Sequence, residues 1–86
     1  MQALYNLGFS LLEKKRLTEA LPYFSEACRI APKSGDSHNA LGFVLFRLGR
    51  LREAKKHFET ALKLNPQDSN ARENLERALR KLNEAP

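Results

Sequence analysis

The stretch LGFVLFRLGRLREAKKHFETALKLNP, residues 41–66, decides the fold because the chain has already used the same pattern once. Residues 7–32 read LGFSLLEKKRLTEALPYFSEACRIAP, and a 34-residue shift superposes the two stretches without a gap. The shift pairs eleven identical residues: Leu7 with Leu41, Gly8 with Gly42, Phe9 with Phe43, Leu11 with Leu45, Arg16 with Arg50, Leu17 with Leu51, Glu19 with Glu53, Ala20 with Ala54, Phe24 with Phe58, Ala27 with Ala61 and Pro32 with Pro66. A fixed period of this length is typical of proteins built from one small, stacked structural unit.

Each unit contains two apolar stripes that are separated by a short break. In the second unit, Leu41, Leu45 and Leu48 form the first stripe, and Ala54 and Phe58 begin the next one. Apolar residues that recur every three or four positions predict amphipathic helices, and no part of the sequence alternates as a strand does. The predicted helices cover residues 2–14, 18–31, 35–48, 52–65 and 69–83.

Prolines and capping residues mark the limits of the units. Pro32 and Pro66 end the second helix of each unit, because proline cannot continue a helix and disfavours helix in the residue before it. Ser34 and Asp68 follow at equivalent positions, where their side chains can accept a hydrogen bond from the first N–H groups of the next helix. The expected divisions are residues 1–34, residues 35–68 and a last segment over residues 69–86.

Small and large residues alternate in a way that lets helices pack closely. Gly8 and Gly42 remove a side chain where a partner helix approaches, while Phe24 and Phe58 fill the space between successive hairpins at close-packed density. Four alanines play the same small-residue part on the second helices: Ala20, Ala27, Ala54 and Ala61. A single hairpin cannot bury its apolar face, so stacking is expected to continue until a helix caps the end.

The last segment has the features of such a cap. Leu75, Leu79 and Leu82 continue the 34-residue pattern, but Glu76 stands at the position where each unit has its glycine. The rest of this segment is heavily charged. A polar outer face on the final helix keeps a helical stack soluble, so residues 69–86 are predicted to form a capping helix.

Composition sets outer limits on the function. The 86 residues suffice for one small domain, and 15 basic against 10 acidic residues give a formal charge of +5. A run of about 18 apolar residues, which a membrane span needs, is missing from the sequence. The N-terminus lacks the charged-then-apolar pattern of a signal peptide. A cytoplasmic location is favoured, although the sequence does not fix the compartment.

The units resemble the tetratricopeptide repeat family, whose pattern is W-x₂-L-G-x₂-Y, A-x₃-F and P within a repeat of about 34 residues. The matching positions are Leu4, Leu7, Gly8, Leu11, Ala20, Phe24 and Pro32 in the first unit, and His38, Leu41, Gly42, Leu45, Ala54, Phe58 and Pro66 in the second. Both aromatic positions of the first helices are replaced. The resemblance covers residues 1–68, and the last segment resembles the family's capping helix. It implies an all-α, right-handed superhelical solenoid of antiparallel helix hairpins, with five helices whose first members line a concave groove.

The resemblance also implies which residues face a ligand in that groove. These are Tyr5, Asn6, Phe9, Leu12, Asn39, Phe43, Phe46, Arg47, Asn74, Arg77 and Lys81. We expect an apolar or amphipathic segment of a protein partner to lie against the rings, with the asparagines bonding its backbone. The alternative is that Phe9 and Phe43 pack on neighbouring helices and that the asparagines are ordinary surface residues.

Some members of the family bind the C-terminal carboxylate of heat-shock chaperones with a clamp of lysine, arginine and asparagine. The clamp positions hold Tyr5, Phe9, Ala40, Asn70 and Asn74 in this chain. The clamp is absent, so the resemblance implies a peptide partner other than a chaperone tail.

Two other kinds of partner remain open. The basic residues Lys14, Lys15, Arg16, Arg47, Arg50, Arg52, Arg80 and Lys81 are expected along one edge, the basic rim. Such a rim attracts nucleic acid, an acidic peptide or a phospholipid surface, but the sequence carries no nucleic-acid motif and a solvated charged edge explains the rim equally simply. Open ends of a helical stack also self-associate, which allows a homo-oligomer.

Catalysis, metal binding and cofactors are not expected. Cys28 is the only cysteine, which excludes an intramolecular disulfide and a zinc cage of several thiolates, and it is predicted to be a small packing residue. His38 and His57 lie on different predicted helices, with no carboxylate at metal-ligand spacing from either. No serine has a histidine and an acid arranged around it.

Overall fold

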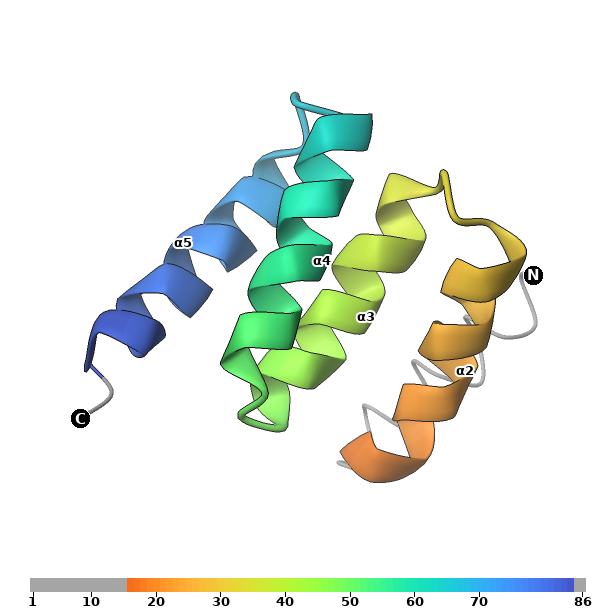
Figure 1. Ribbon diagram of the computed structural model, residues 1–86, viewed down its shortest axis with the longest axis horizontal. Helices are drawn as coiled ribbons and strands as arrows, with labels where there is room; N and C mark the ends of the chain where they lie inside the picture. The colour runs from red at the N-terminus through yellow and green to blue at the C-terminus, as the bar shows by residue number, and fades with distance from the viewer. Residues whose placement is uncertain (1–15, 85–86) are drawn as a thin grey trace.

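The computed structural model describes residues 16–84, which form four α-helices (Figure 1). They are α2 (Leu17–Ile30), α3 (Gly35–Arg47), α4 (Leu51–Leu64) and α5 (Ser69–Glu84). Each begins and ends within one residue of a predicted helix. The all-helical prediction is thus confirmed, with four helices in place of five, because the helix expected over residues 2–14 lies outside the described residues.

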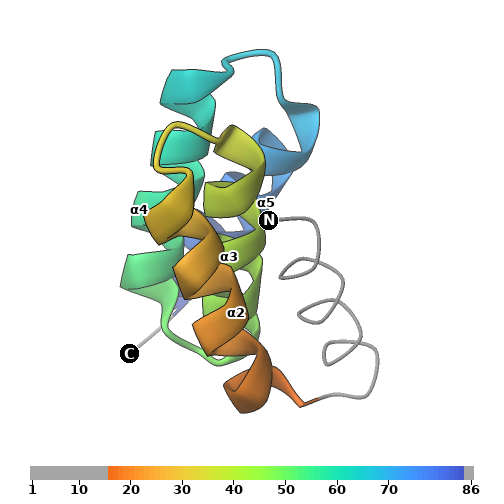
Figure 2. The ribbon, with the colours of Figure 1, turned by 90° about the vertical axis from the view of Figure 1, so that its right-hand side faces the viewer.

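The four helices lie side by side in chain order, and neighbouring helices run in opposite directions (Figure 1). The view turned by 90° shows that α5 begins on the side opposite α4 and then passes behind the other helices (Figure 2). Helix α3 packs against α2 and α4, and it also touches α5. Within residues 16–84, none of the helices combines the length and the apolarity that crossing a membrane requires.

The turns between the helices follow the signals in the sequence. Ser34 Oγ accepts a hydrogen bond from Ser37 N at 3.3 Å at the start of α3. Asp68 Oδ1 accepts bonds from Asn70 N at 3.0 Å and Ala71 N at 3.1 Å at the start of α5. These side chains bond N–H groups that have no partner within the first turn of a helix. Between α3 and α4, Gly49 adopts a φ of +84°, which glycine reaches without steric strain.

The core lies between the helices and is built from equivalent residues of the two units. Phe24 and Phe58 are both fully buried, and each contributes about 1.5–3 kcal/mol through burial of its side chain. Among residues 16–84, the other buried apolar residues are Ala20, Ala27, Cys28, Leu41, Val44, Leu45, Ala54, Ala61, Ala71 and Ala78. Gly42 permits the close approach of α4, because a Cβ there would come within 2.6 Å of Phe58 Cε1.

Helix α5 is covered less completely than α3. Leu45 on α3 is 3% exposed, whereas Leu79, its equivalent on α5 under the 34-residue shift, is 39% exposed. Helix α3 packs between two neighbours, while α5 packs mainly against α4. The apolar face of α5 therefore remains partly open at Leu79.

Candidate functional site: the α3–α5 face

Seven of the residues expected to face a ligand fall within the described part of the chain. They are Asn39, Phe43, Phe46 and Arg47 on α3, and Asn74, Arg77 and Lys81 on α5. We call these seven residues the α3–α5 face. Tyr5, Asn6, Phe9 and Leu12 lie outside the described residues, as do the motif residues Leu7 and Gly8 and the rim residues Lys14 and Lys15.

Two amides of the α3–α5 face bond to each other. Asn74 Nδ2 donates to Asn39 Oδ1 at 3.0 Å, which links two helices whose bonded residues are 35 positions apart. The sequence led us to expect both side chains to bond a ligand backbone, which stays a prediction, and the structure shows that they join α3 to α5. An asparagine offers two N–H donors and a carbonyl oxygen, so a single bond leaves each amide with further hydrogen-bonding capacity.

The aromatic residues of the face have different surroundings. Phe43 is half-buried, and the guanidinium carbon of the exposed Arg47 lies over its ring, 5.7 Å from the ring centre. Such a cation–π contact is worth about 0.5–1 kcal/mol at an exposed site. Phe46 is also half-buried but packs against the core. Phe43 therefore presents the aromatic surface of this face, and Arg47 places a positive charge beside it.

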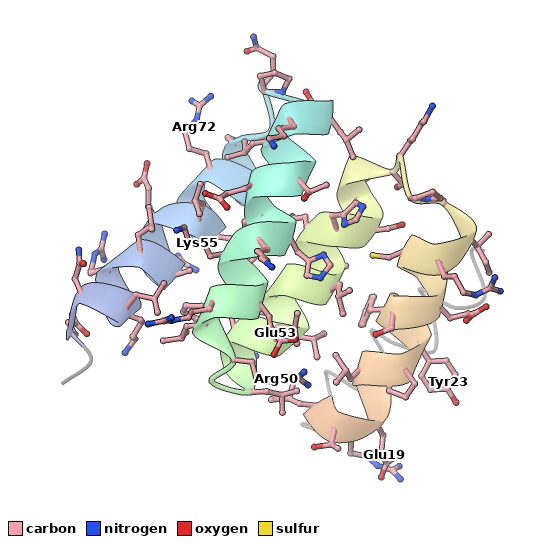
Figure 3. The ribbon with its side chains drawn as sticks, in the orientation of Figure 1. Glu19, Tyr23, Arg50, Glu53, Lys55 and Arg72 are labelled. Atoms are coloured by element: carbon pink, nitrogen blue, oxygen red, sulfur yellow. The ribbon has the colours of Figure 1, made fainter. Side chains whose placement is uncertain are left out.

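Acidic residues on neighbouring turns neutralise part of the positive charge. Arg16 pairs with Glu19 at 2.6 Å, and Arg50 pairs with Glu53 at 2.8 Å (Figure 3). The two pairs are equivalent under the 34-residue shift. On the α3–α5 face itself, Arg77 pairs with Glu73 at 2.7 Å. The basic rim thus carries less uncompensated charge than its list of lysines and arginines suggests.

A second group of polar side chains meets where α2, α3 and α4 come together. Cys28 on α2, His38 on α3 and His57 on α4 bring one donor atom each to within 4.8 Å of one another. Cys28 Sγ lies 4.0 Å from His38 Nδ1, which lies 3.1 Å from His57 Nδ1. We call these three residues the Cys–His–His cluster. The cluster was not predicted from the sequence, in which its three members stand on separate helices.

Burial perturbs two members of the cluster. The Cys28 side chain is 9% exposed, and this burial raises the pKa of its thiol to about 11. The thiol is therefore protonated near neutral pH, as expected for a packing residue rather than a reactive thiolate. Burial is also the main cause that lowers the pKa of His57, with the positive charge of protonated His38 acting in the same direction and Glu53 opposing it.

Stacked antiparallel helix pairs with equivalent cores define a helical repeat protein. The profile of the tetratricopeptide repeat family matches residues 1–67, so the chain belongs to this family. No curated protein matches the chain.

Solved structures similar to the chain agree with this fold. A double mutant of MamA (RS-1 ArsTM) aligns with a TM-score of 0.89 and 24% identity, over 96% of this chain and 47% of that one. The first TPR of Spaghetti (RPAP3), bound to the HSP90 peptide SRMEEVD, aligns with a TM-score of 0.83 and 24% identity, over 87% of this chain and 60% of that one. The C-terminal TPR-containing domain of a putative FK506-binding protein of Plasmodium falciparum aligns with a TM-score of 0.86 and 27% identity, over 94% and 54%. The chain spans about half the length of these proteins.

Proposed function

We propose that the chain is a protein–protein interaction module that binds a peptide or helical segment of a partner against the α3–α5 face. The observation that carries the proposal is Phe43, a half-buried ring with the Arg47 guanidinium over it. Phenylalanine and arginine are both residue types that are enriched at protein–protein interfaces. The peptide bound to the Spaghetti domain supports the proposal, because it occupies a protein of the same fold.

The chemistry of the face indicates the class of partner. An apolar or amphipathic segment can pack on Phe43 while its backbone bonds the further donors of Asn39 and Asn74. The clamp positions within the described residues hold Ala40, Asn70 and Asn74, which cannot neutralise a terminal carboxylate. We therefore infer a partner other than a chaperone tail. We also infer that the chain acts without catalysis, as scaffolds of this family generally do.

The proposal assigns a role to each part of the chain. Residues 1–34 and 35–68 act as two tetratricopeptide repeats, and residues 69–86 act as the capping helix. In a right-handed superhelix, Tyr5, Asn6, Phe9 and Leu12 extend the α3–α5 face into the first repeat.

The test is a peptide-array or pull-down screen, repeated with matched pairs of variants. Phe43→Ala is compared with Tyr23→Ala, because Tyr23 lies on the side of α2 away from α3 (Figure 3). Arg47→Glu is compared with Arg52→Glu, which makes the same charge reversal on α4. We expect Phe43→Ala to weaken binding at least about thirtyfold, because truncating a hot-spot residue costs about 2 kcal/mol or more, while both controls bind as the unchanged chain does. Equal binding by all four variants would refute the proposal.

Self-association is a second candidate function that one observation favours. Leu79 on α5, the last helix, is 39% exposed, so apolar surface is open at this end of the stack. Sedimentation over a concentration series tests the candidate, with Leu79→Gln expected to abolish any dimer. A constant monomer mass would exclude it. The paired arginines of the basic rim give less support to an anionic partner. A steep loss of oligonucleotide affinity between low and moderate salt would favour such a partner, and no measurable binding near physiological salt would exclude it.

A further inference from the structure

We propose that Cys28, His38 and His57 form a binding site for a transition-metal ion of the zinc class. The site is separate from the α3–α5 face and does not depend on the proposed peptide binding. A borderline-soft ion is indicated because the donors are one thiol sulfur and two imidazole nitrogens, which favour Zn²⁺ over the oxygen-seeking Mg²⁺ and Ca²⁺.

The spacing of the donor atoms fits such an ion. With Zn–N bonds of about 2.05 Å and a Zn–S bond of about 2.3 Å, tetrahedral geometry places two nitrogens about 3.3 Å apart and nitrogen and sulfur about 3.6 Å apart. The structure has 3.1 Å between the Nδ1 atoms of His38 and His57, and 4.0 Å between His38 Nδ1 and Cys28 Sγ. Cys28 Sγ and His57 Nδ1 lie within 4.8 Å of each other. The two nitrogens are thus already spaced for an ion, and the sulfur has to move toward them when the ion binds. Three protein donors leave the fourth position to water.

A backbone carbonyl orients one of the two imidazoles. His38 Nε2 lies 2.8 Å from the carbonyl oxygen of Pro32, which can only accept a hydrogen bond. Nε2 therefore carries the proton, and in the neutral ring the lone pair is on Nδ1, the atom that faces the cluster. Metal-binding histidines are commonly held in this way, with the nitrogen that does not bind the metal donating to a carbonyl.

The second imidazole presents its Nδ1 to the same place. The ring centres of His38 and His57 are 5.4 Å apart, whereas their Nδ1 atoms are only 3.1 Å apart. The rings are therefore offset, with their Nδ1 atoms turned toward each other. Because His38 Nδ1 is the acceptor, His57 Nδ1 donates the proton between them. For His57 to bind an ion through Nδ1, its one ring proton moves from Nδ1 to Nε2, so the imidazole stays neutral and metal binding releases only the proton of the Cys28 thiol.

The three donors come from three different helices, so a bound ion joins α2, α3 and α4. The chain around the site is already fixed by the core, since Phe24 and Phe58 are fully buried in the same core cluster as Cys28. The ion is thus expected to raise the thermal stability of a chain that folds without it.

The test is a titration of the full chain with Co²⁺ under reducing conditions, followed by displacement with Zn²⁺. Affinity tags with histidines are removed beforehand. We expect one equivalent of Co²⁺ to bind with a thiolate-to-metal charge-transfer absorption and tetrahedral d–d bands, and Zn²⁺ to raise the Tm. Cys28→Ser removes the charge-transfer band. His57→Gln weakens Zn²⁺ binding at least about tenfold. Removing a residue that only hydrogen-bonds a metal ligand typically costs about 10–100-fold in affinity, and removing a ligand should cost no less.

Two further variants separate loss of the site from loss of the fold. His38→Arg copies Arg72, the equivalent residue under the 34-residue shift, whose Nη2 donates to the carbonyl oxygen of Pro66 at 2.8 Å. This variant keeps the bond to the carbonyl but loses the Nδ1 donor, so it should fold normally and bind Co²⁺ without the tetrahedral bands. The control is Arg72→His. It places a histidine at the equivalent junction, where Leu62 stands at the position of Cys28 and offers no thiol. The proposal is wrong if the unchanged chain shows no charge-transfer band at saturating Co²⁺, or if Cys28→Ser and His38→Arg bind the ion as tightly as it does.

Discussion

The junction between α2 and α3 and the junction between α4 and α5 share one backbone design and differ in chemistry. At the first, the carbonyl of Pro32 accepts a hydrogen bond from His38, and at the second the carbonyl of Pro66 accepts one from Arg72, both at 2.8 Å. The residue four positions before each proline is Cys28 in one case and Leu62 in the other. The repeat therefore fixes where side chains meet, and the individual residues decide whether they bind a ligand or only pack.

The largest expected loss of stability comes from truncating the buried phenylalanine beside each junction, and it tests whether the two cores are equivalent. Phe24→Ala and Phe58→Ala should each lower the free energy of unfolding by about 3–5 kcal/mol, because each removes a fully buried ring. Urea denaturation followed by circular dichroism measures the loss, with the half-buried Tyr23→Ala as the smaller control. A large loss of unfolding free energy in only one of the two variants would show that the two cores are not equivalent.

A smaller effect is expected from the carbonyl bonds themselves. His38→Ala and Arg72→Ala each remove one hydrogen bond to a proline carbonyl, and each should lower the free energy of unfolding by about 0.5–1.5 kcal/mol. In chelator-treated protein, His38→Arg should lose less than His38→Ala, since the arginine restores the bond. If His38→Arg is the less stable of the two, the bond is not what His38 contributes at this junction.

The smallest expected effect is a pH dependence of stability that comes from His57, which contacts His38 at the first junction. The pKa of His57 is lowered from its usual value of 6.5, mainly by burial. The unfolded chain therefore takes up a proton before the folded chain does. The resulting stability is fully present above pH 6.5 and is lost as the pH falls through the lowered pKa of the folded state.

The groups that face His57 are Cys28 on α2, His38 on α3, and Glu53 and Lys56 on its own helix. In the presence of a chelator, the Tm should fall between about pH 7.5 and about pH 5.5, and His57→Gln should reduce this fall. His57→Gln leaves the second junction unchanged, so an undiminished fall in the variant would assign the pH dependence to other groups.

Much of the fold could be predicted from the sequence, because helix positions follow from local patterns. The apolar spacing, the prolines and the capping residues Ser34 and Asp68 placed four helices to within one residue of their observed bounds. The 34-residue shift also pointed to the small residues of the close contacts, among them Gly42 beside Phe58. These features depend on neighbouring residues along the chain, which the sequence displays directly.

The candidate sites could be predicted only in part. The family resemblance implied which residues of α3 and α5 face a ligand, but it did not show that Asn39 and Asn74 bond to each other. The Cys–His–His cluster left one signal in the sequence, since Cys28 and His38 lie at equal distances on either side of Lys33, at the turn between two antiparallel helices. That symmetry could have placed these two residues together, but it says nothing of His57.

By itself, the sequence determined the repeat, the class of fold and the residues available for the core, because periodicity and helix-ending residues act over a few positions of the chain. Only the tertiary structure decided which distant side chains meet. The 3.1 Å between the histidine nitrogens and the 39% exposure of Leu79 depend on how helices cross and on what covers them. Those quantities are set by packing between helices that are far apart in sequence, and no local pattern encodes them.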